Sequence, residues 1–379
     1  MLEALIVGAG PVGLFLACRL ASLGVEVGLL EARRDGSGDS RAIGVHAPAL
    51  ERLARMGLAE RFLADGVRIE RGHAFSSRGF LGSVDFTRAP GLFGCALSLP
   101  QSRTEALLED ALLDLQPSAL RRGQRVVHVR TSARAASLTS VDEHGAWSIT
   151  TARFVIGCDG KRSVVRRSIP ARLRGGPRPG RYVMGDFCDD TSFGPDAILY
   201  LCDEGLVESF PLPGRRRRWV VEIDEAVRSP GPEQVVEPVA RRTGWLLDER
   251  GATMVSAFGV EQRLTTRFHR GPLVLAGDAA HVVCPFGGQG MNLGWLDAWD
   301  LARTLTKVLR EGHDADAALS AYARRRQRSA RATARRAAIN TRLGRRPSWP
   351  RARNAALTAA LTMVPQALLA AAFSMRGIG

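Results

Sequence analysis

The sequence lacks several features that would assign a protein to a class at once. Its six cysteines, at positions 18, 95, 158, 188, 202 and 284, form no Cys-x-x-Cys pair and no group with histidine. Such spacing excludes the common zinc and disulfide frameworks, so we expect no metal and a reducing compartment. No charged leader or cleavage pattern precedes the first apolar segment, and we expect a cytoplasmic protein.

Lysine is almost missing, since only Lys161 and Lys307 stand beside 51 arginines in the 379 residues. This bias is typical of GC-rich codon usage, and we expect no nucleic acid partner. The formal net charge of +15 still creates a field that attracts anionic nicotinamide cofactors and anionic lipid. With 45% hydrophobic residues, the chain is long enough for two or three domain-sized units with a buried core.

The first motif is an apolar run at residues 4–7, followed by Gly8, Gly10 and Gly13 in G-x-G-x-x-G spacing and then by a helical pattern. In this arrangement the first glycine permits a tight turn, the second lets a pyrophosphate approach, and the third lets helix and strand pack closely. A second strand pattern ends in Glu31, near the interval of about 20 residues at which a carboxylate binds a ribose. Together these features predict dinucleotide binding.

Two later strand patterns also end in a glycine and a carboxylate. Asp159 and Gly160 follow the strand that begins at Arg153, although Asp159 is explained equally well as the cap of a short helix. Gly277 and Asp278 follow the apolar residues 271–276, and a carboxylate at such a strand end can bind sugar or ribityl hydroxyls. The pattern predicts ligand-binding carboxylates at one edge of a sheet.

The loop Gly287 to Asn292, with sequence GGQGMN, precedes a helix that we expect over residues 292–309. Its glycines let the backbone approach a flat ring, and the amides at the helix start favour negative charge that develops on a reduced flavin. An ordinary glycine-rich loop between strand and helix is the alternative interpretation.

Over residues 4–309 these motifs resemble the FAD-dependent aromatic hydroxylases of the para-hydroxybenzoate hydroxylase type. This family of single-component flavoprotein monooxygenases includes ubiquinone-pathway and polyketide-tailoring enzymes. The resemblance implies FAD as cofactor and NAD(P)H as a transient co-substrate, and it adds Arg41 near the pyrophosphate and Gln101 near the flavin. The expected cofactor-binding residues are Gly8, Gly10, Gly13, Glu31, Arg33, Arg41, Gln101, Asp159, Gly160, Gly277, Asp278, Gly287, Gly288, Gln289, Gly290, Met291 and Asn292.

Because the motifs lie far apart in sequence, we expect an α/β fold with a discontinuous, Rossmann-like FAD-binding domain. Its segments are residues 1–72, 98–170 and 265–345. A largely antiparallel β-sheet substrate-binding domain occupies 73–97 and 171–264, and a helical C-terminal segment occupies 346–379. Ser102 and Glu105 predict a capping box. The four arginines at 215–218 predict a solvated hairpin tip.

The C-terminal segment allows two interpretations. Twelve arginines lie between Arg324 and Arg353, and the apolar residues 355–373 are interrupted by Pro365. Two short helices could pack against the FAD-binding domain or a partner subunit, in a monomer or homodimer. Alternatively, the segment makes a peripheral membrane contact, with arginines on phosphates and apolar side chains in lipid.

The resemblance implies that reduced FAD adds O2 to give a C4a-hydroperoxide, which hydroxylates or epoxidises an aromatic, polycyclic or quinone-like substrate. Pro285 is expected in the wall of the oxygen-transfer pocket. His46, His281 and Tyr200 are candidate bases by location only. The sequence departs from the family pattern at two places. Cys284 replaces the first of two prolines before the glycine loop. Pro48-Ala49 replaces an Arg-Thr pair and removes a positive side chain, so the resemblance does not define where the nicotinamide docks.

Three other functions deserve comparison. An FAD-dependent reductase or dehydrogenase of a prenyl or polyketide substrate would share all the flavin motifs. A flavin-dependent halogenase would show a W-x-W-x-I-P stretch, which none of the six tryptophans provides. A non-enzymatic flavin-binding module would not oxidise NAD(P)H rapidly.

Overall fold

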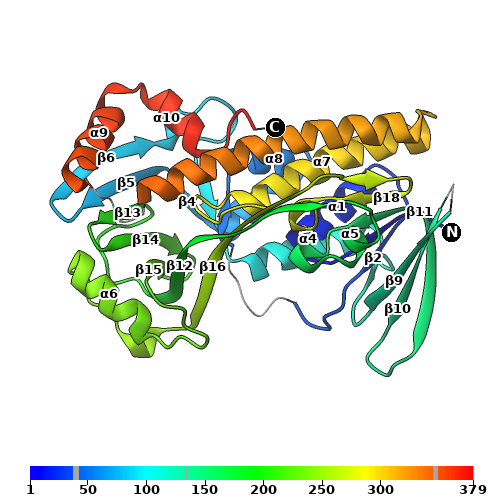
Figure 1. The fold of residues 1–379 in the computed structure, drawn as a ribbon, viewed down its shortest axis with the longest axis horizontal. Helices are drawn as coiled ribbons and strands as arrows, with labels where there is room; N and C mark the ends of the chain where they lie inside the picture. Colours follow the sequence, from blue (N-terminus) through cyan, green and yellow to red (C-terminus); the bar gives the residue numbers. More distant parts are fainter. Residues whose placement is uncertain (37–41, 133–134, 345–348, 379) are drawn as a thin grey trace.

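The computed structural model describes residues 1–36, 42–132, 135–344 and 349–378, and two large sheets dominate it (Figure 1). The first sheet has the order β17 (His269–Arg270), β18 (Leu273–Leu275), β11 (Trp147–Gly157), β1 (Leu2–Val7), β2 (Val27–Leu30) and β8 (Leu120–Arg121). Strands β18, β11, β1, β2 and β8 are parallel. The antiparallel strands β10 (Ala136–Val141) and β9 (Arg125–Thr131) extend from β11.

The helices that pack on the first sheet come from widely separated parts of the chain. Their bounds are α1 (Pro11–Ser22), α4 (Gln101–Leu115), α5 (Val164–Arg167), α7 (Gln289–Arg310) and α8 (Ala315–Gly344). Phe15 of α1 stacks on Trp295 of α7, with ring centroids 5.2 Å apart. Because α1 and α7 both follow glycine-rich turns, this packing brings the two turns to the same side of the sheet.

The second sheet has the order β19 (His281–Val282), β16 (Met254–Thr265), β12 (Leu173–Cys188), β15 (Arg216–Ile223), β14 (Gly205–Leu212), β13 (Ala197–Cys202), β5 (Arg71–Ser76) and β6 (Gly79–Asp85). Only the β13–β5 pairing is parallel, so the expected antiparallel character is confirmed. A small third sheet, β3 (Gly44–Val45), β7 (Ala96–Ser98) and β4 (Val67–Ile69), lies between the helices and this sheet.

Each face of the second sheet packs against different partners. One face carries Tyr182, Met184, Leu206 and Val220, which cluster with the loop residues Cys284 and Phe286. We call it the loop-side face. The opposite face carries Val183, Trp219 and Tyr200 and is covered by α6 (Glu233–Thr243). In Figure 1, α6 lies below this sheet while α8 and α9 lie above it.

Short elements complete the chain. They are α2 (Ala47–Ala54), α3 (Ala59–Asp65), α9 (Pro350–Met363) and α10 (Gln366–Phe373), with the 3-10 turns η1 (Phe86–Arg88), η2 (Gly160–Arg162), η3 (Glu249–Gly251) and η4 (Gly277–Ala279). The mixed α/β architecture with a helical C-terminal region confirms the predicted fold class.

The capping box predicted at Ser102 and Glu105 is wrong. Helix α4 begins one residue earlier, at Gln101, and its N-cap Pro100 offers no side-chain oxygen. Glu105 is buried and instead accepts a hydrogen bond from Gln101 Nε2 at 2.8 Å. Helix α7 also begins earlier than expected, at Gln289, so the glycine-rich loop is partly the first turn of the helix.

The prediction of a solvated tip at residues 215–218 is wrong for two of its four arginines. Arg217 and Arg218 lie inside β15 and are 0% and 1% exposed. Arg218 forms two hydrogen bonds to Asp186, of 2.6 and 2.8 Å, and Arg217 Nε lies 3.0 Å from Asp189 Oδ2. Burial of these guanidinium groups is tolerated because each pairs with a carboxylate.

The C-terminal segment forms two helices, but they do not pack on the first sheet. Helices α9 and α10 contact β6, and α10 also contacts η1 (Figure 1). The chain then returns towards the glycine-rich loop, where Met375 and Ile378 are buried with Val283 and Leu293. No single described helix is long and apolar enough to span a membrane; only the α9–α10 pair, bent by 114°, reaches that length and composition.

Candidate functional site

The three N-terminal glycines occupy the turn from β1 into α1, and each meets a different environment. Gly8 has φ of +98°, and an added Cβ would lie 2.7 Å from the Cys158 carbonyl oxygen. At Gly13 it would lie 1.9 Å from the Gly8 carbonyl oxygen, so only glycine fits. At Gly10 no atom lies within 4 Å, and α1 begins there without a side-chain cap. The turn therefore leaves helix amides beside open space that suits a phosphate.

Glu31 lies directly after β2 and reaches back to this turn. Its Oε2 accepts a hydrogen bond from the Ala9 amide at 2.7 Å, and its Oε1 accepts from the Arg33 amide at 3.0 Å. The guanidinium of Arg33 also lies 3.2 Å from Glu31 Oε1. Glu31 therefore holds the glycine turn in place, and the half-exposed Arg33 is turned towards Glu31.

Asp159 caps a helix with one carboxylate oxygen and leaves the other without a partner in the described protein. Its Oδ2 accepts hydrogen bonds from the amides of Val164 and Val165, at 2.6 and 3.3 Å, so it caps the short helix α5. Its Oδ1 is buried and has no hydrogen-bond partner among the described residues. Burial raises the pKa of this carboxyl. Gly160 follows with φ of +70° and open space around its Cα.

Gly277 and Asp278 form the turn η4, which contacts η2 and thus lies beside Asp159. An added Cβ on Gly277 would lie 3.1 Å from Val12 of α1. Asp278 is exposed to solvent, yet the crowding protein atoms remove enough water to raise the pKa of its carboxyl. A side chain that is both accessible and crowded lies in a concave part of the surface.

The structure thus brings the ends of β1, β2, β11 and β18 to one edge of the sheet, as their parallel pairing requires. Ligands gather at this edge in open α/β sheets. The loop Gly287–Asn292 reaches the same region through α7, whose first half packs on α1 and η4.

A hydrogen-bond network attaches this loop to β3. Asn292 Oδ1 accepts from the His46 amide at 2.8 Å, and Asn292 Nδ2 donates to the carbonyls of Gly44 and Gly288, at 2.8 and 2.7 Å. Gly287 and Gly288 have φ of +75° and +63°, a backbone conformation that glycine adopts without strain. The polar atoms of Asn292 therefore hold the loop shape that the sequence assigned to cofactor contact.

His46 lies against the same loop. Its Nε2 is 2.6 Å from the Gly287 carbonyl oxygen, and because a carbonyl only accepts, Nε2 is the donor. Burial lowers the pKa of His46, so the ring is neutral and Nδ1 carries a lone pair. That nitrogen is buried without a partner among the described residues.

The other loop residues are arranged around these contacts. Pro285 is exposed, and its carbonyl accepts a hydrogen bond from the Gly288 amide at 2.9 Å. Gln289 is buried with an unpartnered Oε1, whereas Gly290 and Met291 are half-buried in the first turn of α7. Pro285 thus stands at the mouth of the loop, while its carbonyl already has one donor.

Two further residues of the expected cofactor set behave differently. Gln101 Oε1 accepts from the Ala42 amide at 3.4 Å, which ties α4 to the segment before β3. Arg41 lies outside the residues that the structure describes.

Tyr200 and His281 are not available as bases at this site. Tyr200 belongs to the opposite face of the second sheet, where it stacks on Phe75 and accepts a hydrogen bond from Trp245 Nε1 at 3.0 Å. The register of β13 places it there, because successive residues of a strand alternate between faces. His281 is 1% exposed and lies in an ion-pair network with Asp297, which also binds Arg326 at 2.6 Å.

Sequence reasoning overlooked Glu208, a carboxylate on the loop-side face of the second sheet. Glu208 shares the strand β14 and its face with Leu206, and its register partner on β15 is Val220. It is 8% exposed, and no hydrogen bond or ion pair joins it to another described residue. Desolvation raises the pKa of this carboxyl to about 7. The only sign of it in the sequence is a glutamate within the mostly apolar strand β14.

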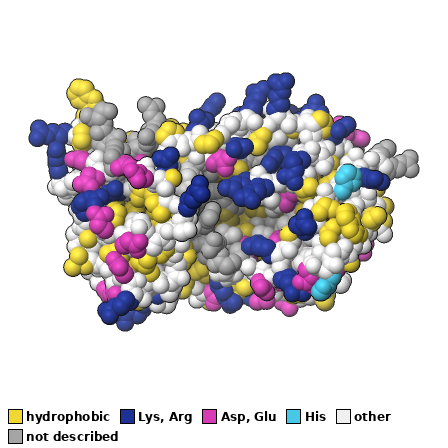
Figure 2. Space-filling view, turned by 60° about the horizontal axis from the view of Figure 1, so that its bottom comes forward, with side chains coloured by type: hydrophobic (Ala, Val, Ile, Leu, Met, Phe, Trp, Pro, Cys, Tyr) yellow, Lys and Arg dark blue, Asp and Glu magenta, His cyan; other side chains and the backbone are white. Residues whose placement is uncertain are grey.

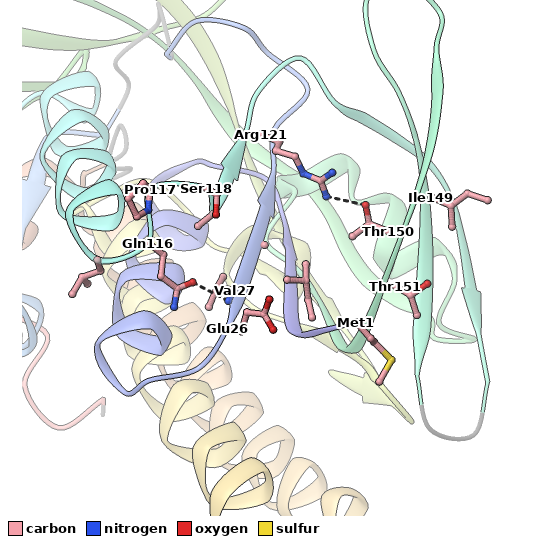
Figure 3. A pocket seen from close by; sticks show the side chains of 14 residues that line it. Met1, Glu26, Val27, Gln116, Pro117, Ser118, Arg121, Ile149, Thr150 and Thr151 are labelled. Atoms are coloured by element: carbon pink, nitrogen blue, oxygen red, sulfur yellow. Dashed lines mark hydrogen bonds between the residues drawn. The ribbon is translucent and has the colours of Figure 1, made fainter.

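A separate open groove of 960 Å³ lies at the other end of the first sheet (Figure 3). Its lining includes Met1 and Val27, at the starts of β1 and β2, and Arg121, whose guanidinium donates to Thr150 Oγ1 at 2.8 Å. Since the glycine turns follow the opposite ends of these strands, this groove is distinct from the candidate site.

The residues present fit a bound FAD. The buried atoms Asp159 Oδ1, Gln289 Oε1 and His46 Nδ1, all within the motifs, have no partner in the described protein. A buried polar atom without a partner is costly, and a polar ligand would satisfy it. The open space at Gly10 and the uncapped start of α1 suit a pyrophosphate. Positive side chains are also frequent on the face of the molecule that Figure 2 shows, which suits an anionic cofactor.

Curated proteins are similar to this chain in sequence. An uncharacterized aromatic compound monooxygenase of Bacillus subtilis is 33% identical over 314 residues, which cover 81% of this chain and 62% of the relative. The 6-methylpretetramide 4-monooxygenase of Streptomyces rimosus is 32% identical over 336 residues, covering 86% of this chain and 59% of the relative. The chain therefore spans about three fifths of the length of these curated relatives.

Solved structures agree on the fold. The p-nitrophenol 4-monooxygenase of Pseudomonas putida has a TM-score of 0.88 at 24% identity, over 96% of this chain and 94% of that one. The anhydrotetracycline hydroxylase of Streptomyces rimosus has a TM-score of 0.82 at 28% identity, over 99% of this chain and 76% of that one. The family model described as an FAD binding domain matches residues 1–337. With its glycine turns, strand-end carboxylates and GGQGMN loop in place, the chain belongs to this FAD-binding family.

Proposed function

We propose that the protein is an FAD-dependent monooxygenase that uses NAD(P)H and O2 to hydroxylate or epoxidise an aromatic, polycyclic or quinone-like small molecule. The carrying observation is that the Gly8–Gly13 turn, Asp159 and Gly277–Asp278 lie at one sheet edge, next to the loop that begins at Gly287. Relatives named as aromatic and polyketide monooxygenases, at 32–33% identity, support the reaction class.

In this proposal residues 1–72, 98–170 and 265–345 bind FAD, and residues 73–97 and 171–264 bind the substrate. Bound FAD would take a hydride from NAD(P)H and activate O2 for transfer to the aromatic ring. The start of α1 holds the pyrophosphate, Glu31 the adenosine ribose and Asp278 the ribityl hydroxyls. Gly287 and Gly288 let the backbone lie along the flavin ring. His46 holds the Gly287 carbonyl in position.

Substrate would lie between the loop Gly287–Asn292, which we call the flavin loop, and the loop-side face of the second sheet. Phe286, which is 5% exposed, packs edge-on against Tyr182 with centroids 4.7 Å apart and seals the space behind the loop. Pro285 then forms part of the pocket wall. Such closure matters because water that reaches an activated oxygen species discharges it unproductively.

The test is reduction of the purified, FAD-loaded protein with NADH or NADPH under anaerobic conditions, followed by 18O2 and a panel of phenols and hydroxyanthraquinones. One atom of 18O in an aromatic product supports a monooxygenase. Substrate reduction without 18O incorporation would instead establish the alternative, an FAD-dependent reductase or dehydrogenase. Failure of both nicotinamides to bleach the flavin would contradict both enzymes and leave a binding module.

We also propose a peripheral contact between the outer face of α9–α10 and anionic lipid. Met363 and Leu368 are 81% and 63% exposed, and residues 345–378 contain five arginines and no carboxylate side chain. Positive charge beside exposed apolar side chains suits an anionic bilayer. Co-sedimentation with phosphatidylglycerol vesicles, but not with phosphatidylcholine vesicles, would support this contact. Absence of co-sedimentation, or burial of the face in a dimer seen by analytical ultracentrifugation, would contradict it.

A further inference from the structure

The candidate site has a loop that can hold a flavin, but two of the three bases named from the sequence cannot act on a substrate there. The third, His46, lies against the loop itself, where its Nδ1, unpartnered among the described residues, suits the cofactor. Tyr200 lies on the wrong face of its sheet, and His281 is tied to Asp297. A hydroxylated aromatic ring becomes a better oxygen acceptor when its hydroxyl is ionised, so a nearby proton acceptor is useful. The loop-side face of the second sheet supplies one such group.

Strand β14 places Glu208 on the loop-side face, beside the residues that pack under the loop. At one end of the strand, Leu206 packs in the cluster that includes Cys284 and Phe286. At the other end, the Pro211 carbonyl accepts a hydrogen bond from Ser98 Oγ at 2.5 Å, and Ser98 pairs with Gly44 of β3. Gly44 in turn accepts from Asn292 of the flavin loop. Glu208 therefore lies on a strand that contacts the residues before the loop at one end and, through Ser98, β3 at the other.

The side chain of Glu208 is directed to the loop-side face. Strand side chains alternate, so Glu208 shares a face with Leu206, whereas Val207 and Ser209 face α6. Burial is the main cause that raises the pKa of the Cys284 thiol, and the negative charge of Glu208 adds to it, in keeping with the placement of both groups on this face. A carboxylate that is more than nine-tenths buried and unpartnered is costly unless a ligand or proton satisfies it.

The other charged and titratable groups on this face are already engaged. Arg218 of β15 is paired with Asp186 of β12, and Glu222 Oε2 accepts from the Leu206 amide at 3.2 Å. The Cys284 thiol lies 3.2 Å from Thr341 Oγ1 of α8, and Arg353 of α9 donates to the Leu201 carbonyl. Tyr182 is buried in the cluster. Among the described residues of this face, Glu208 is therefore the titratable group that remains for a ligand.

We propose that Glu208 accepts the proton of an aromatic hydroxyl group on the substrate, and that the substrate is therefore a phenol. This inference rests on the proposed monooxygenase function. The substrate O–H bond breaks, its electron pair stays on oxygen, and the proton forms an O–H bond with the Glu208 carboxylate. No electrons are exchanged, and the carboxylic acid returns its proton to water when the product leaves.

The pKa of about 7 that desolvation gives Glu208 matches this role, because a proton acceptor works best when its pKa lies near the working pH. An acid held at its ordinary pKa would be a weaker base towards a phenol. The apolar surroundings of β14 thus set both the location and the basicity of the group.

The experiment is a binding titration of the FAD-loaded protein with 2-hydroxyanthraquinone, whose visible band moves to longer wavelength when its hydroxyl ionises. The titration is made below the pKa of the free phenol, without NAD(P)H. With the unmodified protein we expect the bound dye to show the ionised band. With Glu208→Gln we expect the neutral band and a loss of ionisation of at least tenfold, and with Glu208→Asp a partial return of the ionised band.

Glu222→Gln is the matched control. Glu222 lies on the same face, but its carboxylate already accepts a hydrogen bond from a backbone amide, so the dye bound to this variant should keep the ionised band. An ionised band in Glu208→Gln, a neutral band in the unmodified protein, or no binding of the dye would each overturn the proposal. Because the titration needs neither nicotinamide nor oxygen, its outcome is independent of 18O incorporation. A protein that ionises the dye but transfers no oxygen would contradict the proposed function alone.

Discussion

The backbone amide of His46 donates a 2.8 Å hydrogen bond to the side-chain oxygen of Asn292, across 246 positions of sequence. The ring of the same histidine donates to the Gly287 carbonyl. His46, which follows β3, therefore holds the glycine loop at both of its ends. Two glycines with left-handed backbone would otherwise be free to rearrange. The loop is therefore pre-shaped by contacts outside itself, which reduces the cost of ordering it around a flavin.

Asn292→Asp should weaken FAD binding. The amide nitrogen of Asn292 donates to two carbonyls, and a carboxylate oxygen at that place would repel both. We expect the FAD dissociation constant to rise by about tenfold to a hundredfold, corresponding to the roughly 1–3 kcal/mol of an unsatisfied buried group. Quenching of flavin fluorescence measures it. Ser102→Ala, at an exposed position of α4, should leave the constant unchanged; equal affinity of both variants would show that Asn292 does not shape the loop.

Gly10→Ala and Gly13→Ala should separate binding from folding. A methyl group added at position 10 meets no atom within 4 Å, so this variant should melt within a few degrees of the unmodified apoprotein but bind FAD poorly. A methyl group at position 13 would overlap the Gly8 carbonyl oxygen, and this variant should unfold at much lower temperature or fail to fold. Melting curves of the apoproteins, together with FAD titrations, distinguish the two effects. Normal FAD affinity of Gly10→Ala would argue against a pyrophosphate at this turn.

Glu208→Gln should stabilise the fold at high pH. Its pKa is raised from 4.5 to about 7, so burial of the charge costs stability progressively as pH rises through this range. We expect the variant to be more stable than the unmodified apoprotein by up to about 3 kcal/mol above pH about 8, and equally stable below pH about 4.5. Urea unfolding at a series of pH values measures the difference. A difference that does not change with pH would mean that Glu208 stays exposed to water.

Asp297→Asn should have the opposite pH dependence. Burial alone would raise the pKa of Asp297, but the charges of His281 and Arg326 and their hydrogen bonds lower it below 3.8. The carboxylate therefore contributes stability above this pH, which is lost as pH falls through the folded-state pKa. At neutral pH we expect a loss of about 3–5 kcal/mol, because the substitution leaves the buried Arg326 guanidinium without its carboxylate.

Urea unfolding again provides the measurement, with Asp190→Asn, at an exposed position, as the comparison. That control should change the free energy of unfolding by less than about 0.5 kcal/mol. A loss of similar size in both variants would show that the Asp297 network contributes nothing specific.

The sequence by itself determined the elements that carry the cofactor motifs. Local rules were enough for this, since G-x-G-x-x-G spacing, apolar runs and strand-end carboxylates depend on residues close in the chain. The strands expected around Gly8, Glu31, Asp159 and Asp278 are present, and their parallel pairing brings these residues to one sheet edge. Alternation of apolar residues likewise indicated β13, β14 and β15.

Only the tertiary structure decided which side chains are free to act. Strand register turns Tyr200 towards α6 and Glu208 towards the loop, a choice that depends on how the whole sheet is covered. Arg217 and Arg218 read as solvated until Asp189 and Asp186 were placed beside them. The contacts of Asn292 with β3 likewise follow from the tertiary structure. Each of these outcomes depends on partners distant in sequence, which local pattern does not encode.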